Sequence, residues 1–334
     1  MREQPSKRPR IGVALGGGAA RGWAHLGVIR ALREEGIDPW CVAGTSIGSF
    51  IGAAWISGSL DRLTREVLAL NLRRLLPFFR VHLARAGLID GRSLEPLIRQ
   101  FVTAERFEDL PRRFGLNATD LRLGEEVPIR EGDLLSGILA STAVPGLFSP
   151  VERDGRLLVD GGLVNPVPVS LAREMGAEVV VAVDINHHVV RDGPWQHHGE
   201  ATQVPGEDSV PAESGDDGDP DRKAPWPEWM RRWLPSTRNS GSDSPGPKRP
   251  GLHEVLWMGI AIGEVAIGDL RMQIDRPEVL IRPRVGHIPF LDFSRGGEAI
   301  DAGYEAAREI LGDPAVRARL GLAPREDFRV PSDP

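Results

Sequence analysis

Five short runs of β-branched and other apolar residues set the strongest limit on the fold of this chain. Several are apolar on both faces, so they need cover on both sides, as strands of parallel sheets between helices do. Segments with helical periodicity alternate with them. The pattern predicts an α/β fold, a three-layer sandwich with a largely parallel central sheet. The expected strands are residues 11–15, 40–45, 157–160, 179–185 and 279–281.

Helical periodicity and composition divide the chain into parts. The expected helices are residues 22–35, 47–58, 60–76, 93–101, 134–141, 254–276 and 297–311. Residues 191–250 hold ten prolines and seven glycines but only three residues among Val, Ile and Leu, too few to bury an apolar core. We therefore expect a core at 1–188, a flexible Pro/Gly-rich insertion at 189–250, the C-terminal part of the core at 251–312 and a tail at 313–334.

Composition excludes several classes of protein. The formal net charge is −6, whereas a dedicated nucleic-acid binder carries a basic surface, so no nucleic-acid partner is expected. Cys41 is the only cysteine and cannot form an internal disulfide, which excludes a disulfide-framed secreted fold. The chain shows no export signal, and no apolar stretch reaches the roughly 18 residues of a membrane span. We expect a cytoplasmic protein, with peripheral membrane contact as a further expectation.

Residues 44–48 form a G-x-S-x-G pattern directly after an expected strand and before a helical run. In that context the glycines permit a sharp turn that exposes the serine oxygen, and the helix N-terminus favours developing negative charge. A glycine-rich turn capped by a serine gives the same pattern, and both interpretations stay open at this point. On the first, Ser46 is a nucleophile and its turn consists of Gly44, Thr45, Ile47 and Gly48.

A glycine-rich loop follows the first expected strand and opens a helix. Its amides can converge on an anion, which suits an oxyanion hole. Nucleotide binding is disfavoured, because Arg21 takes the place of the third glycine of G-x-G-x-x-G, and Trp23 and Ala24 replace the Lys and Ser/Thr of a P-loop. Arg21 either holds the loop or faces a substrate phosphate. The loop residues proposed for the oxyanion hole are Gly16, Gly17, Gly18, Arg21 and Gly22.

Asp160 ends the expected strand 157–160 and precedes Gly161 and Gly162. This position leaves its carboxylate at the C-terminal edge of a strand, where sites form in open α/β sheets. An Asp-Gly turn residue is common, so Asp160 alone would mean little. Together with Ser46, it is a candidate general base.

These three elements together resemble the patatin-like phospholipase family, bacterial type, whose pattern is a G-G-G-x-x-R-G loop, a G-x-S-x-G turn and a later D-G-G. The similarity extends to residues 118–121, 140–150 and 165–168, and covers roughly residues 8–188 and, more weakly, 251–312. It implies a cofactor-free, metal-free Ser-Asp dyad that cleaves the acyl esters of phospholipids, lysophospholipids or other lipids. Ser46 would attack and Asp160 would take its proton, with an acyl-enzyme as intermediate.

Two other functions remain open from the sequence. One is an α/β-hydrolase esterase with a Ser-Asp-His triad, because His253 and His287 follow Asp160 in the order used by that fold. The other is a catalytically silent, lipid-binding regulator. The remaining histidines are expected to be structural: His25 packed and hydrogen-bonded, and the pairs at 187–188 and 197–198 on the surface, without the spacing of a zinc site.

Two segments combine apolar and basic residues and are candidates for membrane contact. Residues 60–83 are rich in Arg, Leu and Phe, and residues 225–235 carry Trp and Met at helical spacing beside basic residues. Either segment suits an interfacial helix. A helix packed on the protein explains each pattern equally well.

Overall fold

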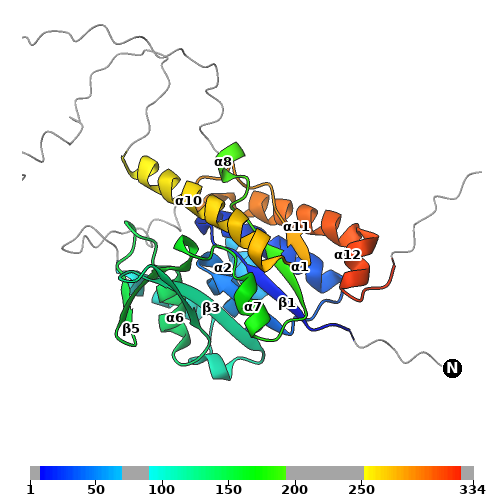
Figure 1. Cartoon of the computed structure of the whole chain (residues 1–334), viewed down its shortest axis with the longest axis horizontal. Coiled ribbons are helices and arrows are strands. Elements are labelled where there is room, and N and C mark those ends of the chain that lie inside the picture. The colour runs from blue at the N-terminus through cyan, green and yellow to red at the C-terminus, as the bar shows by residue number, and fades with distance from the viewer. Residues whose placement is uncertain (1–7, 70–89, 193–251, 325–334) are drawn as a thin grey trace, which may run out of the picture. The chain divides into compact units, whose positions relative to one another are not determined.

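The computed structural model describes residues 8–69, 90–192 and 252–324 (Figure 1). The expected insertion from residue 193 onward, the expected helix beyond residue 69 and the Trp-rich segment 225–235 lie outside the described residues. The predictions made for them stay predictions.

One mixed sheet forms the centre of the described chain, with strand order β5-β6-β3-β2-β1-β7-β8 and β4 paired with β3. The strands β1, β2, β3, β7 and β8 pair in parallel, whereas β4 and β6 run antiparallel to β3, and β5 runs antiparallel to β6. Their bounds are β1 Ile11–Leu15, β2 Cys41–Thr45, β3 Arg113–Asp120, β4 Glu125–Ile129, β5 Val151–Arg153, β6 Arg156–Asp160, β7 Val179–Val183 and β8 Val279–Ile281.

Side chains alternate between two apolar cores, one on each face of the sheet. On β1, Val13 and Leu15 enter the larger core and Ala14 enters the smaller one. The larger core lies under α1 Ala24–Glu34, α2 Ile47–Ile56, α3 Leu60–Leu68, α5 Glu95–Phe101, α6 Leu134–Ser141 and α11 Gly296–Gly312. The smaller core lies under α7 Val169–Glu174 and α10 Leu252–Asp275. This arrangement confirms the predicted three-layer α/β sandwich with a largely parallel sheet.

Small residues allow close packing on the second face. Cys41, Ala43 and Ala182 lie in the smaller core, and a Cβ at Gly12 would lie only 2.6 Å from Ala177 Cβ. Cys41 is fully buried, and burial raises the pKa of its thiol to about 11. Cys41 therefore serves as a small packing residue of the smaller core.

The C-terminal part of the chain completes the larger core (Figure 1). Helix α11 packs on α1 so closely that a Cβ at Gly27 would overlap the Ile300 carbonyl, and one at Gly303 would overlap that of Ala24. The range expected to be tail contains a further helix, α12 Pro314–Arg319. Arg317 ties it to the core by donating to Glu35 Oε2 over 2.7 Å.

Candidate active site

Strands β2 and β6 meet end to end along one edge of β3, and this brings Ser46 and Asp160 together. β2 runs parallel to the first half of β3, where Thr45 pairs with Asn117. β6 runs antiparallel to the second half, where Asp160 pairs with the next residue, Ala118. β4 pairs with Leu116 to Asp120 along the other edge of β3, so β2 and β6 lie on the same edge. Because these two strands run in opposite directions, their C-terminal ends point at each other.

The turn from β2 into α2 holds Ser46 in a conformation that L-residues rarely adopt, with φ 53° and ψ −125°. Such strain persists only where the surroundings enforce it. The Ser46 N–H donates to Ser141 Oγ over 2.9 Å, and Ser49 Oγ donates to the Ser46 carbonyl over 2.6 Å. A Cβ at Gly48 would overlap the Leu15 carbonyl, so the second glycine of the pattern is needed for close approach.

Asp160 accepts a hydrogen bond from the candidate nucleophile directly. Ser46 Oγ lies 2.5 Å from Asp160 Oδ2, and the Gly162 N–H donates to Oδ1 over 2.8 Å. The Asp160 side chain is buried, and this burial raises its pKa to about 6, although both hydrogen bonds act in the opposite direction. A carboxylate with such a pKa is a competent general base near neutral pH.

The glycine loop faces Ser46, but only part of it is free to donate. Gly16 N–H and Gly17 N–H donate inward, to the Val183 and Pro166 carbonyls. Among the described residues, the amides of Gly18 and Ala19 have no backbone acceptor. Both residues have positive φ, 152° and 48°. Within this loop the amides of Gly16 and Gly17 are thus already bonded, whereas those of Gly18, which was among the expected donors, and of Ala19 have no backbone acceptor in the described part of the chain.

Arg21 holds this loop through a hydrogen bond to its backbone. It is buried, its Nε donates to the Gly18 carbonyl over 3.3 Å, and its guanidinium lies 5.8 Å from the centre of the Phe290 ring. Burial lowers the pKa of Arg21 to about 10, which leaves it charged at neutral pH. Gly22 lies against Ile47, where a Cβ would clash, so close packing requires a glycine at this position.

Polar side chains behind the dyad join β2, β3 and the Asp-Gly-Gly turn. Thr45 Oγ1 lies 2.6 Å from Asn117 Oδ1, and Asn117 Nδ2 donates to the Asn165 carbonyl over 3.0 Å. All three residues are fully buried. Asn117 and Asn165 had no predicted role, because their contacts with each other and with Thr45 join segments that lie far apart in the chain.

Glu264 of α10 is a second carboxyl group at the site, and the sequence analysis also missed it. A Cβ at Gly162 would lie 2.6 Å from Glu264 Oε1 and 3.2 Å from Asp160 Oδ1. The signal was a single acidic residue in the otherwise apolar run of residues 255–268. An isolated charge on a helix that covers a sheet marks a functional candidate.

The described histidines do not enter the dyad. His25 is fully buried, its Nε2 lies 2.8 Å from the Gly16 carbonyl oxygen, and burial lowers its pKa to about 4. His287 pairs with Glu298 at 2.5 Å. The side chain of His253 lies outside the described residues. His25 thus packs as expected, and the ring of His287 is bonded to a carboxylate other than Asp160.

One group of potential metal ligands occurs among the described residues, formed by Asp184, His187 and Asp269. Arg282 already bonds both of its carboxylates, at 3.2 and 2.9 Å. Because both carboxylates already bond Arg282, the cluster gives no support to a metal site.

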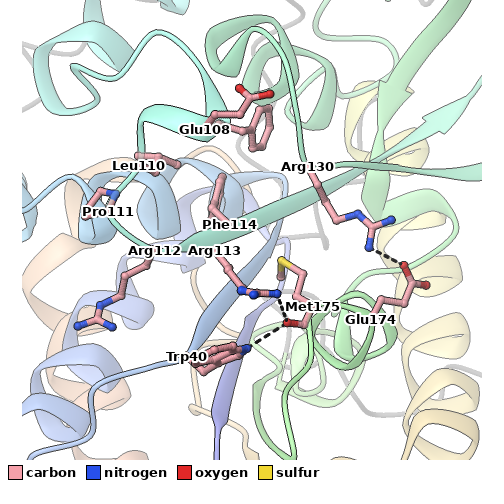
Figure 2. A pocket seen from close by; sticks show the side chains of 11 residues that line it. Trp40, Glu108, Leu110, Pro111, Arg112, Arg113, Phe114, Arg130, Glu174 and Met175 are labelled. Atoms are coloured by element: carbon pink, nitrogen blue, oxygen red, sulfur yellow. Dashed lines mark hydrogen bonds and ion pairs between the residues drawn. The ribbon is translucent and has the colours of Figure 1, made fainter.

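A pocket of about 580 Å³ lies at the opposite, amino-terminal ends of β2 and β3 (Figure 2). Its arginines have partners: Arg130 pairs with Glu174, and Arg113 stacks over Trp40 at 4.7 Å. Figure 2 shows Trp40 and Arg113 both directed at the Met175 carbonyl. This pocket is therefore separate from the Ser46 site.

The sandwich and its strained strand-to-helix serine define an α/β protein with a nucleophile-elbow type of site. The model of the family described as Patatin-like phospholipase matches residues 13–173, a range that includes both Ser46 and Asp160. Residues 13–173 of the chain thus form a patatin-like phospholipase domain.

Two curated relatives each match about half of this chain. An NTE family protein of Mycobacterium tuberculosis is 38% identical over 186 residues, which are 56% of this chain and 52% of the relative. The human patatin-like phospholipase domain-containing protein 6 is 34% identical over 52% of this chain and 13% of its own length. The chain thus matches about half, or less, of these relatives. The crystal structure of VipD from Legionella pneumophila covers 91% of this chain and 67% of its own, with a TM-score of 0.43 and 13% identity.

Proposed function

We propose that this chain is a serine acyl hydrolase of the phospholipase A or lysophospholipase type, which cleaves lipid acyl esters with a Ser46-Asp160 dyad. The observation that carries the proposal is the 2.5 Å hydrogen bond from Ser46 Oγ to Asp160 Oδ2 on a strained turn. The names of the human relative and of the matching family add support for a lipid substrate.

In the proposed reaction, Asp160 Oδ2 takes the proton as Ser46 Oγ attacks the ester carbonyl. The amides of Gly18 and Ala19 stabilise the oxyanion of the tetrahedral intermediate. Asp160 then gives its proton to the leaving alkoxide, and an acyl-Ser46 ester remains. A water molecule attacks this ester with Asp160 again as base, which releases the fatty acid and restores the serine.

A triad is the weaker alternative on this geometry. In a Ser-Asp-His triad the imidazole stands between the hydroxyl and the carboxylate, whereas Ser46 here bonds Asp160 directly. A silent lipid-binding regulator would not need an aligned base, so no observation favours it over catalysis.

We also propose that the enzyme works against a lipid surface. Helix α10 carries Glu264 beside the site, and its other side exposes an uncharged face, which we call the α10 apolar stripe. The stripe consists of Val255, Leu256, Gly259, Ile262, Ala266, Leu270 and Ile274. An exposed apolar helix face suits the boundary of a bilayer. No helix in the described part of the chain is long and apolar enough to cross one.

Labelling with a fluorophosphonate tests the nucleophile. We expect the wild type and Ser57→Ala to react, Ser46→Ala to stay unlabelled, and Asp160→Asn to react far more slowly. Hydrolysis of acyl-labelled phospholipid, lysophospholipid and triacylglycerol should fall about 1,000-fold or more in Ser46→Ala, since the loss of a nucleophile removes the covalent route. Labelling of Ser46→Ala at the wild-type rate would contradict the assignment.

A further inference from the structure

Glu264 connects the dyad with the glycine loop. Its Oε1 and Asp160 Oδ1 both lie close to the position that a Cβ of Gly162 would occupy, at 2.6 and 3.2 Å. The two carboxyl groups are therefore neighbours because residue 162 has no side chain. Glu264 Oε2 accepts from Asn186 Nδ2 over 2.9 Å. Asn186 is buried, and its Oδ1 would lie 2.7 Å from a Cβ at Gly18. Asn186 therefore links Glu264 to the residue whose amide we assign to the oxyanion.

The position of Glu264 is fixed by bonds along α10. Arg271 of this helix bonds Glu126 over 2.9 Å and the Val164 carbonyl over 3.3 Å. Since Val164 lies two residues after Gly162, these bonds tie the helix to the segment that carries Asp160.

Two charged groups face Glu264 from neighbouring elements, Asp160 from β6 and Arg21 from the glycine loop. The charges on the other elements that pack on α10 have their own partners: His188 pairs with Asp192 of α8 (Val189–Asp192), and Arg173 of α7 pairs with Glu278. Burial and the charge of Asp160 raise the pKa of Glu264 to about 8, while Arg21 acts in the opposite direction. Between about pH 6 and pH 8, Asp160 is thus ionised while Glu264 is neutral.

We propose that Glu264 is a pH gate of the dyad, which permits catalysis while its carboxyl group is neutral and closes the site when it ionises. The reason is the position of Arg21, whose charge lies beneath the loop that receives the oxyanion. With Glu264 neutral, the field of Arg21 acts on the oxyanion without a compensating charge. Ionised Glu264 compensates that field and adds a second negative charge beside Asp160, so oxyanion formation becomes harder. Glu264 is a positioning residue in this account and forms no bond with the substrate.

The test rests on the proposed function and measures kcat/KM from about pH 5 to about pH 10 with a neutral, soluble p-nitrophenyl ester. Ser46→Ala supplies the background, and the product is read at the isosbestic wavelength of nitrophenol. We expect the wild type to fall about tenfold from pH 7 to pH 9, as the neutral fraction of a group with a pKa near 8 falls. Glu264→Gln should lose this alkaline limb and keep the acid limb, which belongs to Asp160.

Three further measurements separate the gate from a merely structural role. Asp269→Asn, on the same helix, should keep the wild-type profile, and Glu264→Asp should restore an alkaline limb at a different pH. The Tm of Glu264→Gln relative to the wild type should rise from about pH 4.5 to about pH 8 and level off above that, because in this range the folded wild type keeps a proton that the unfolded chain has lost. This last measurement does not depend on turnover.

The outcomes are distinguishable. An alkaline limb that survives unchanged in Glu264→Gln overturns the gate alone. Loss of the alkaline limb in Asp269→Asn as well would also overturn the gate, because a general change in α10 would then explain the effect. Absence of Ser46-dependent turnover at every pH overturns the proposed function, and the gate with it.

Discussion

At the scale of single residues, the nucleophile depends on side chains that never touch the substrate. Ser46 adopts its positive φ because Ser141 of α6 accepts its N–H and Ser49 of α2 donates to its carbonyl. Each bond satisfies a polar group that would otherwise be buried and unpaired. The strain at Ser46 is thus held by its two neighbours, and their removal should affect stability and catalysis together.

We expect Ser141→Ala to lower the free energy of unfolding by about 1–3 kcal/mol, the cost of a buried amide without an acceptor. The kcat for a soluble ester should fall at least tenfold, because the turn can relax, while KM changes little. Urea unfolding and steady-state kinetics measure the two effects.

Thr142→Val is the matched control for Ser141→Ala. It removes a hydroxyl from the next residue, where Oγ1 donates only to carbonyls of its own helix, Ile138 at 2.8 Å and Leu139 at 3.3 Å. This variant should keep near-normal kcat. If Ser141→Ala turns over as fast as Thr142→Val, the bond to Ser46 does not hold the nucleophile.

At the scale of elements, the sequence predicted the strands with continuous apolar runs and missed those with polar or edge character. β1 and β8 have the predicted bounds, and β2, β6 and β7 differ by at most two residues at an end. β3 was missed because its buried Asn117, Thr119 and Asp120 look like loop residues in the sequence. β4 contains Pro128, which is typical of an edge strand and argues against a central one.

The same limit applies to the site. Ser46, Asp160 and the glycine loop follow predicted strands, and each was a candidate from local sequence. Glu264, Ser141 and Asn117 come from elements whose neighbours along the chain say nothing of the dyad. Their roles depend on long-range pairing, which periodicity and turn chemistry do not report. The resemblance to the family supplied the pairing of Ser46 with Asp160 before the sheet explained it.

The α10 apolar stripe gives a prediction at this scale. Ile262→Glu with Leu270→Glu should reduce binding to anionic vesicles about tenfold or more, because half-exposed aliphatic side chains each lose about 1 kcal/mol of burial in the bilayer boundary. Hydrolysis of vesicle phospholipid should fall likewise, while turnover of a soluble ester stays unchanged. Co-sedimentation and fatty-acid release are the measurements.

The control for this double variant is Leu121→Glu with Leu123→Glu, which adds the same charge at exposed leucines after β3. If the two double variants bind vesicles equally well, the proposed contact of α10 with the lipid surface is wrong. A change from dimer to monomer in the α10 variant alone, without loss of vesicle binding, would instead identify the stripe as a contact between two copies of the chain.

At the scale of the whole molecule, ionised Asp160 lowers the stability of the folded chain at neutral pH. Asp160 is buried near the end of the central sheet, and its pKa rises from 3.8 to about 6 because burial disfavours its charge. A raised carboxyl pKa means that the folded state binds the proton more tightly than the unfolded state. The corresponding stability is fully present below pH 3.8 and is lost as the pH rises through about 6. At neutral pH the general base therefore costs folding free energy.

We expect Asp160→Asn to be more stable than the wild type by about 1–3 kcal/mol at pH 8, since a two-unit shift corresponds to about 3 kcal/mol and the amide keeps only part of the hydrogen bonding. The difference should shrink as the pH falls through 6 and vanish near pH 4, where the carboxyl group of the wild type is protonated in the folded state. Chemical unfolding across this pH range measures it. Glu309→Gln, at an exposed position of α11, should show no such trend. If the difference in unfolding free energy between Asp160→Asn and the wild type stays constant with pH, then Asp160 is not ionised while it is buried. The dyad would then lack its base.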